Sequence, residues 1–275
     1  MASLVMKLRP KLSRRVLVNI KFLEYLENLE HLVHMQKKDI NSTKAQGLPL
    51  RLRAVLFDMD GVLYDSMPYH AKAWHHAMAQ FGYDLPEEEV YMHEGRTGSS
   101  TVNLVSRRQH GQEVSEEHVA EIYKVKSDIF NTFPPAAPMP GALSLLRQLK
   151  EQGVMILIVT GSGQRSLLDK LNHHYPDIFR RELMVTAFDV KHGKPDPEPY
   201  LMGMQKGCLT PEECIVVENA PLGVRAAKAA GIFTIAVNTG PLPDSVLTDE
   251  GADLLFPSMQ ALSDGWKQLS ELLNK

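Results

Sequence analysis

Six short apolar runs constrain the fold of this chain more than any other feature. Most are separated by segments with helical spacing, and they contain Val, Ile and Leu without polar alternation, as strands buried on both faces do. The sequence therefore predicts an α/β fold, a parallel sheet with helices on both sides. The runs are AVLF (54–57), VMILIV (154–159), ELMVTA (182–187), CIVV (214–217), IFTIAV (232–237) and ADLLF (252–256).

A stretch without strong strand signals interrupts this alternation between residues 65 and 139. PYHAKAWHHAMAQFG, STVNLVSRRQHG and SEEHVAEIYKVKSDIFNTF each have helical character, and the last begins with serine and acidic residues. A helical insertion of about seventy residues between two strands is typical of a cap. We expect a helical cap domain at 67–138, a core domain at 51–66 and 139–275, and hinges near Tyr64 and Met139.

The first fifty residues differ from the rest of the chain. Before Glu24 they contain six basic residues and no acidic one. Apolar residues at helical spacing from Phe22 to Val33 predict an amphipathic helix that contacts the core or another subunit. A polar segment ending at Pro49 follows, so residues 1–50 are expected to be an N-terminal extension and linker.

The bulk composition excludes several classes of protein. Of the 275 residues, 44% are hydrophobic and 23% are charged, as in ordinary globular proteins. The net charge of −3 gives no reason to expect a nucleic-acid partner, and no apolar run is long enough to span a bilayer. Cys208 and Cys214 lack metal-binding or redox spacing, which favours a reducing compartment. We expect a cytoplasmic protein.

Polar residues follow the predicted strands at the edge where parallel strands of a sheet end together. Two aspartates only two residues apart follow the first strand, and such like charges need a cation, a shared proton or solvent. Together the strand ends supply carboxylates, a hydroxyl group with backbone amides, and a cation. The residues are Asp58, Asp60, Thr160, Gly161, Ser162, Lys194, Glu218 and Asn219.

These residues form four motifs along the chain: Asp58 with Asp60, Thr160 to Ser162, Lys194, and Glu218 with Asn219. Their order, with a helical cap after the first, resembles the haloacid dehalogenase superfamily. FDMDGV (57–62) and ENAPLGVRAAKAAGI (218–232) resemble its β-phosphoglucomutase-like branch. The resemblance extends from Ala54 to the C-terminus. It implies a Rossmann-like parallel-sheet core and phosphoryl transfer through an aspartyl-phosphate, with Mg²⁺ as cofactor.

The resemblance assigns roles to four catalytic residues. Asp58 would be the nucleophile, and Asp60 would protonate the leaving oxygen and then deprotonate water. Thr160 and the backbone amides of the next two residues, Gly161 and Ser162, would bind the phosphate oxygens. Lys194 would contact both the phosphate and Asp58.

The predicted metal site has one departure from the branch pattern. Mg²⁺ would be bound by the Asp58 carboxylate, the Asp60 carbonyl and an oxygen of Glu218 or Asn219. Asn219 stands where the branch usually has aspartate, so one negative charge is missing. A carboxylate from the cap loop, Glu94, would restore that charge if it reached the metal; a solvated glutamate is the alternative.

Other cap residues are candidates for substrate binding. His70 would contact the leaving group or Asp60, although a lone histidine is often structural. Arg96 and Thr97 lie in the cap loop HEGRTGSST, where family members place specificity residues, and a solvated loop is the alternative. Gly98 stands where β-phosphoglucomutase has an arginine for the second phosphate, which argues against a mutase.

These observations predict a Mg²⁺-dependent phosphohydrolase acting on a small phosphorylated metabolite. Inorganic pyrophosphate is the first compound to test, because a cap carboxylate at the metal would leave room only for a small leaving group. The alternatives are a β-phosphoglucomutase or a sugar phosphatase, and, more remotely, a non-catalytic phosphate-binding protein. A dehalogenase is disfavoured, because a halide leaves without being protonated. Such an enzyme does not need the second carboxylate that this chain has at Asp60.

Overall fold

The computed structural model describes residues 51–162 and 171–273. The chain divides into two compact units, Met1–Pro49 and Leu50–Lys275, and the fold described below belongs to the second. The expected helix at 22–33 and the linker after it lie outside the described residues. No helix in the described part of the chain is long and apolar enough to cross a membrane.

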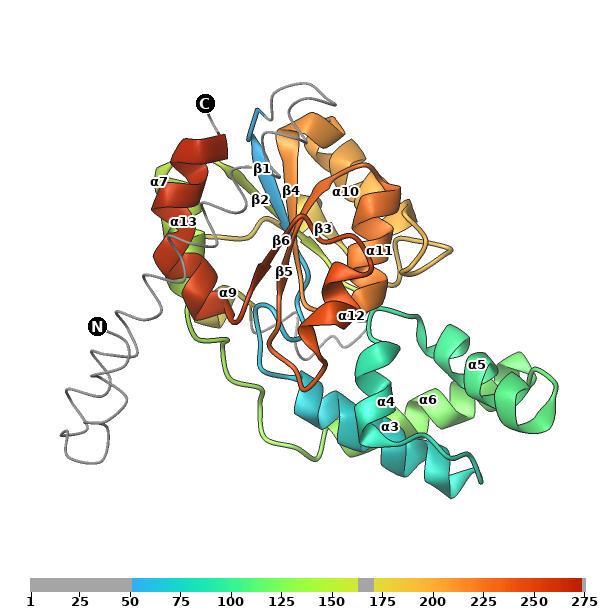
Figure 1. Ribbon diagram of the computed structural model, residues 1–275. Helices are drawn as coiled ribbons and strands as arrows, with labels where there is room; N and C mark the ends of the chain where they lie inside the picture. The colour runs from blue at the N-terminus through green and yellow to red at the C-terminus, as the bar shows by residue number, and fades with distance from the viewer. Residues whose placement is uncertain (1–50, 163–170, 274–275) are drawn as a thin grey trace, which may run out of the picture. The chain divides into compact units, whose positions relative to one another are not determined.

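A parallel sheet of six strands forms the centre of the second unit (Figure 1), which confirms the predicted fold class. Its order is β3-β2-β1-β4-β5-β6, so the first strand is central and its apolar residues are completely buried. The strands are β1 (Ala54–Phe57), β2 (Met155–Val159), β3 (Met184–Val185), β4 (Cys214–Glu218), β5 (Phe233–Val237) and β6 (Leu254–Phe256).

The predicted strand at 182–187 is wrong in its extent. The pairing of β3 covers only Met184 and Val185, and a 3₁₀ turn, η2 (Arg181–Leu183), precedes it. This strand lies at the edge of the sheet and pairs only with the end of β2. One neighbour offers fewer hydrogen bonds than the two neighbours of a central strand, so the backbone turns away early.

Helices cover both faces of the sheet. Figure 1 shows α7 and α13 on one side and α10, α11 and α12 on the other. Their apolar faces close the core, in which Leu56 and Val216 of the sheet pack with Tyr200 and Ala227 of the helices. The elements are α7 (Ala142–Glu151), α9 (Leu171–His174), α10 (Glu198–Gly207), η3 (Pro211–Glu213), α11 (Pro221–Ala229), α12 (Asp244–Thr248) and α13 (Met259–Leu273).

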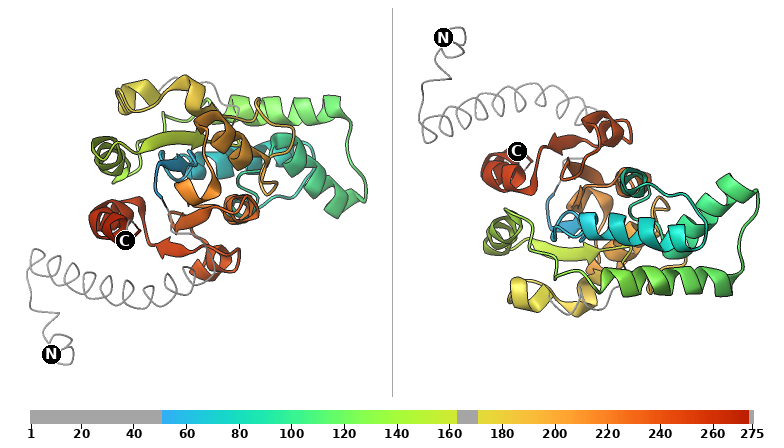
Figure 2. Two further views of the ribbon diagram at one scale, coloured as in Figure 1. Left: turned by 90° about the horizontal axis from the view of Figure 1, so that it is seen from above. Right: turned by 90° about the horizontal axis from the view of Figure 1, so that it is seen from below.

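Four helices lie between β1 and α7, and together they form the helical insertion. It has its own apolar cluster, which includes Trp74, Met78, Val105 and Ile122, and Figure 2 shows α3 and α6 side by side. Ser115 caps α6 by accepting a hydrogen bond from the amide of His118 (3.3 Å), as the serine start predicts. The helices are α3 (Met67–Gln80), α4 (Glu87–Met92), α5 (Gly98–His110) and α6 (Glu116–Phe130); α4 was not predicted.

The two connections between this insertion and the sheet run beside each other. The Asp65 amide donates to the Ala137 carbonyl (2.9 Å), and the Met139 amide donates to the Leu63 carbonyl (2.8 Å). Figure 1 shows the insertion at the end of the sheet where β1 leads into α3. The insertion therefore lies beside the carboxyl ends of the strands, where the candidate site residues are.

Candidate active site

Lys194 joins the predicted catalytic residues at the edge of the sheet. Its Nζ lies 2.5 Å from Asp58 Oδ1 and 2.6 Å from Glu218 Oε1, and it donates to the Val159 carbonyl (3.1 Å). These contacts connect the ends of β1, β2 and β4. Lys194 is only 2% exposed, so little water competes for them and the attraction between the charges is strong.

Burial and charge act against each other in this cluster. Burial raises the pKa of Asp58 to about 7, because it outweighs the opposing effect of Lys194, and the carboxylate of Glu218 adds to the rise. Burial lowers the pKa of Lys194, but Asp58 and Glu218 outweigh it and keep the pKa well above its ordinary value. The lysine is therefore a fixed positive charge beside the candidate nucleophile.

Glu218, a predicted metal ligand, is engaged by protein groups on both oxygens. Oε1 accepts hydrogen bonds from Lys194 and from the Tyr200 hydroxyl (2.8 Å). Oε2 accepts from the amides of Asn219 (2.9 Å) and Ala220 (3.0 Å), at the start of α11. The position of Glu218 is thus fixed from both sides. Tyr200, which sequence reasoning missed, completes this set.

The carboxylate of Glu94, in the loop between α4 and α5 of the insertion, reaches Asn219 at the end of β4. Asn219 Nδ2 donates to both oxygens of Glu94 at 3.1 Å. Burial raises the pKa of Glu94 well above its ordinary value, and Asp58 and Glu218 raise it further. Asn219 Oδ1 is buried and has no hydrogen-bond partner. The structure therefore brings together the two residues that the sequence hypothesis connected.

The donor set at this end of the site fits a hard cation. Lys194 contacts two carboxylates, Asp58 and Glu218. Glu94 is close enough to both, and to Asp60, for their charges to raise its pKa. The unpartnered Asn219 Oδ1 is a further oxygen of the kind that Mg²⁺ accepts. No group of three or more His, Cys, Asp or Glu side chains within 51–162 and 171–273 is arranged to hold a metal by itself. Backbone and amide oxygens, with water, would have to complete the shell.

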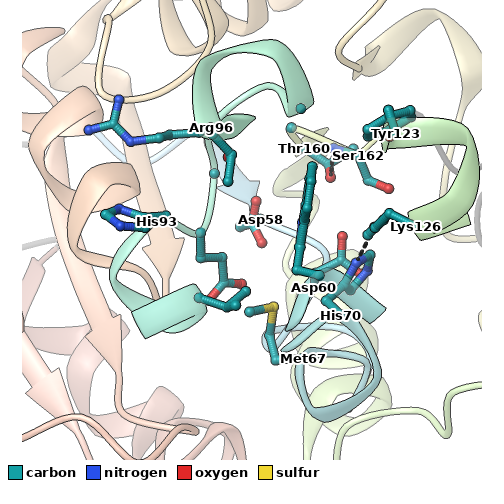
Figure 3. A pocket seen from close by; sticks show the side chains of 17 residues that line it. Asp58, Asp60, Met67, His70, His93, Arg96, Tyr123, Lys126, Thr160 and Ser162 are labelled. Atoms are coloured by element: carbon teal, nitrogen blue, oxygen red, sulfur yellow. Dashed lines mark hydrogen bonds and ion pairs between the residues drawn. The ribbon is translucent and has the colours of Figure 1, made fainter. Parts of the chain in front are cut away.

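Asp60 faces a different set of partners. Its Oδ1 accepts a hydrogen bond from the Ser66 hydroxyl (2.5 Å) and lies 3.2 Å from Nε2 of His70, which Figure 3 shows beside Asp60. Burial raises the pKa of Asp60, but His70, Ser66 and Lys126 outweigh it, so the pKa lies below its ordinary value. The structure thus places His70 at Asp60, one of the two predicted contacts.

Lys126 sets the tautomer of His70. Its Nζ lies 2.8 Å from His70 Nδ1. A lysine ammonium can only donate, so Nδ1 accepts, and the ring proton lies on Nε2, facing Asp60. Nζ also lies within 5.1–5.7 Å of the ring centres of Phe130, Trp74 and Tyr123. Burial lowers the pKa of Lys126 to about 8.

Sequence reasoning missed Lys126, although a signal was present. The buried residues of α6 are Val119, Ile122, Lys126 and Phe130, which recur at helical spacing. A lysine within such an apolar stripe is buried and needs a partner. Ser66, which directly precedes α3, carried no comparable signal.

The phosphate-binding candidates line a small cavity. The Thr160 hydroxyl accepts from the Ser162 amide (3.0 Å), and both residues lie beside Asp58 (Figure 3). The cavity has a volume of about 70 Å³. Residues 163–170, which follow Ser162, lie outside the described residues. The lining includes Asp58, Asp60, Thr160, Gly161 and Ser162 from the core, and Met67, His70, Trp74, Glu94, Arg96 and Tyr123 from the insertion.

The two specificity candidates in the cap loop make local contacts instead. Arg96 lines the cavity, but its guanidinium points away from Asp58 (Figure 3) and donates to Ser100 (3.2 Å). Thr97 caps α5 by accepting from the Ser100 amide (3.2 Å) and does not line this cavity. Both side chains are used at the start of α5, and of the two only Arg96 lines the cavity; their contact with a substrate stays a prediction.

Gly98 packs directly against an aromatic ring. A Cβ atom at this position would lie 2.6 Å from Cε2 of Tyr123, far inside van der Waals contact. An arginine therefore has no room here in the observed arrangement. The space that a mutase arginine would need is occupied by Tyr123.

The fold and this site agree with comparisons with known proteins. The family model for haloacid dehalogenase-like hydrolases matches residues 55–237. The chain belongs to this family, as the sequence resemblance predicts. It is 36% identical to hexitol phosphatase A of Escherichia coli, over 78% of this chain and 94% of that protein. It is 26% identical to β-phosphoglucomutase of Bacillus subtilis, over 79% and 96% of the two chains.

A solved structure confirms the branch. A candidate β-phosphoglucomutase from Bacteroides vulgatus superposes with a TM-score of 0.85 at 55% identity, covering 88% of this chain and 99% of that chain. Of these three proteins, hexitol phosphatase A supports a hydrolase of phosphoesters, and the other two carry the name β-phosphoglucomutase.

Proposed function

We propose that this protein hydrolyses phosphate monoesters of small sugars or polyols through an aspartyl-phosphate on Asp58. The observation that carries the proposal is the buried contact of Asp58 with Lys194, 2.5 Å, beside Asp60 at the end of β1. The similarity to hexitol phosphatase A supports the substrate class. On this point the comparisons favour the predicted alternative, a sugar phosphatase, over inorganic pyrophosphate.

The first half of the reaction joins Asp58 to phosphorus. Lys194 donates to Asp58 Oδ1, which leaves Oδ2 as the attacking oxygen. The bond from phosphorus to the ester oxygen breaks, and that oxygen takes a proton from Asp60. The Thr160 hydroxyl and the amides that follow it bind the other phosphate oxygens.

The second half restores the enzyme. Asp60 removes a proton from water, and the water oxygen attacks phosphorus, releasing phosphate and the free Asp58 carboxylate. Ser66 and His70 hold Asp60 and lower its pKa, which favours the ionised form that Asp60 has after the first half. The proton that it takes from water is the one that the first half of the next cycle uses. Protonated Lys194 offsets negative charge throughout both steps.

Mg²⁺ is the proposed cofactor. Asp58, the Asp60 carbonyl and Asn219 Oδ1 would hold it, and it would supply charge neutralisation at the transferring phosphoryl group. Glu94 would add a carboxylate from the helical insertion. We propose that the insertion, residues 67–138, is a cap that closes over the core and excludes water.

Pyrophosphate is a second candidate substrate, and a specific contact favours it. Glu94 occupies space above Asn219, and the cavity of about 70 Å³ is small. Such a site suits a short leaving group. Mutase activity has less support, because Tyr123 fills the space beside Gly98 where a second phosphate would need a cationic partner.

A substrate panel tests these proposals. Phosphate release would be measured from glycerol phosphate, hexitol phosphate, β-glucose 1-phosphate and pyrophosphate, with Mg²⁺ and with EDTA, and with Asp58→Asn as control. We expect the highest kcat/KM on a sugar or polyol phosphate, no turnover in EDTA and none in the variant. Preference for pyrophosphate by more than about tenfold would overturn the sugar assignment and support the second candidate. Glucose 6-phosphate from β-glucose 1-phosphate and its bisphosphate would indicate a mutase.

A further inference from the structure

Three glycines of the core lie where the insertion approaches the catalytic edge most closely. A Cβ atom on Gly161 would lie 2.8 Å from the carbonyl oxygen of Gly95. One on Gly193 would lie 2.9 Å from Thr97 Cγ2, and one on Gly240 would lie 3.2 Å from the ring of Tyr91. Ordinary carbon contacts are about 3.5–4.0 Å, so a side chain at any of these positions would push the loop away.

The segment from Tyr91, in the last turn of α4, through the loop to Thr97 is matched to this surface. Gly95 has φ +89°, and a Cβ atom there would lie 2.9 Å from Cδ of Lys194. Gly95 of the loop also faces Gly161 of the core, so a glycine lies on each side of the contact. The loop lies against the core at positions where there is no room for an added Cβ atom, directly beside the lysine that contacts Asp58.

Space, and not backbone conformation, explains the glycines at 193 and 240. Neither has the positive φ that favours glycine, in contrast to Gly95. An alanine could adopt the same backbone angles at both positions. The methyl group of an alanine would, however, push the loop away from the core. Glycine at these positions therefore permits the close contact.

The depth of this contact controls the position of Glu94. Glu94 directly precedes Gly95, and its two hydrogen bonds with Asn219 are 3.1 Å long. Retreat of the loop by about 1 Å would lengthen both beyond the hydrogen-bond range. The same retreat would enlarge the cavity, because Glu94, Gly95 and Arg96 form part of its wall.

We propose that Gly193 and Gly240 determine substrate size, by letting the cap loop approach closely enough to exclude large leaving groups. Both act as positioning residues, since neither lines the cavity around Asp58. This inference rests on the proposed phosphatase function and deepens it. The substrate class that it selects is a phosphate ester with a short leaving group.

The test compares Gly193→Ala with the wild type on glycerol phosphate and hexitol phosphate. We expect kcat/KM for glycerol phosphate to fall about tenfold, because displaced groups at a reacting centre are costly. The ratio of the two kcat/KM values should shift about tenfold toward hexitol phosphate, mainly through KM of the larger ester. Equal loss on both substrates, or an unchanged ratio, would overturn the proposal.

A compensating substitution separates this effect from misfolding. Thr97→Ser removes Cγ2 and keeps the hydroxyl that caps α5, so the double variant Gly193→Ala/Thr97→Ser should recover most of the wild-type ratio. Gly240→Ala, against the Tyr91 ring, should shift the ratio in the same direction by a smaller factor. A double variant no better than Gly193→Ala, or a shift of Gly240→Ala in the opposite direction, would count against the proposal.

Hydrogen exchange gives a readout that does not need turnover. Amides of residues 91–97 should exchange several-fold faster in Gly193→Ala than in the wild type, while amides of β1 and β4 remain unchanged. If the wild type hydrolyses neither ester, the proposed substrates are wrong, yet faster exchange in this segment would still support the close contact. Identical exchange in the two proteins would overturn it.

Discussion

Two buried lysines show how differently the core and the helical insertion contribute to the site. Lys194 in the core and Lys126 in the insertion are both 2% exposed. The first lies between two carboxylates, and its pKa is raised. The second lies against a histidine and three aromatic rings, and its pKa is lowered to about 8. The same side chain, equally buried, is a fixed charge in one place and a weak base in the other.

The difference lies in the partners, not in the burial. Burial opposes the charged form of both lysines, but carboxylates at 2.5 and 2.6 Å more than offset this at Lys194. At Lys126 the more distant charge of Asp60 offsets only part of the effect of burial, and no carboxylate is in direct contact. Of the two lysines, the one in the core supplies a fixed charge beside Asp58. The one in the insertion orients His70.

The largest effect is expected at the core nucleophile. Asp58→Asn should lower kcat by at least about 10⁴-fold, because an amide neither attacks phosphorus nor binds a metal comparably. Phosphate release from p-nitrophenyl phosphate measures this loss. Residual activity within tenfold of the wild type, in protein made without a wild-type copy in the host, would remove Asp58 from the mechanism.

Removing the core cation should affect both turnover and stability. Lys194→Met leaves Asp58 and Glu218 buried without their shared partner, and breaking such a pair costs about 3–5 kcal/mol. We expect kcat to fall about 10²–10³-fold, the size of effect seen when a preorganised charge or donor is removed. Urea unfolding and phosphate release measure the two quantities. A variant as stable as the wild type would contradict the proposed role of the ion pairs.

The same substitution in the insertion should behave differently. Lys126→Met keeps a long side chain among Trp74, Tyr123 and Phe130, so the free energy of unfolding should not decrease. We expect kcat to fall only about tenfold, because His70 would lose the donor that fixes its tautomer, and Asp60 its oriented partner. Lys126→Arg, which keeps a donor, is the matched control. A loss of stability as large as that of Lys194→Met would erase the contrast between the two lysines.

The contrast also explains which residues the sequence could reveal. Asp58, Thr160 and Glu218 come at or directly after strand ends, and in a parallel sheet those ends share one edge. A residue that follows a predicted strand of a parallel sheet can therefore be assigned to this edge from the sequence alone. The described structure brings all three predicted strand ends together, and Lys194 with them.

Positions in the insertion depend on how helices pack, which local sequence specifies poorly. Lys126 becomes a partner of His70 only because α3 and α6 lie side by side. Arg96 and Thr97 have the right residue types, but the start of α5 uses both of them. The short extent of β3 also depends on tertiary structure. Its apolar residues do not indicate that the strand lies at the edge of the sheet.

The smallest effect, and the sharpest test of how the two regions cooperate, concerns Glu94 and Asn219. Glu94→Gln removes a charge from the insertion and keeps the size of the side chain, so the Mg²⁺ concentration for half-maximal activity should rise several-fold. Asn219→Asp adds a charge in the core and should partly restore Mg²⁺ binding in the Glu94→Gln background. In the wild-type background it places a second carboxylate 3.1 Å from Glu94, and this repulsion should offset its gain.

The four proteins of this cycle, titrated with Mg²⁺ in one assay, give the coupling between the two positions. Because both side chains act on one ion, the two changes should not be additive. The same titration on glycerol phosphate and pyrophosphate shows whether the charge at Glu94 also favours one leaving group. Additive effects, or an unchanged Mg²⁺ requirement in Glu94→Gln, would mean that the cap carboxylate contacts Asn219 without contributing to metal binding. The insertion would then only enclose the substrate, and the charge missing at Asn219 would have to be supplied by the core alone.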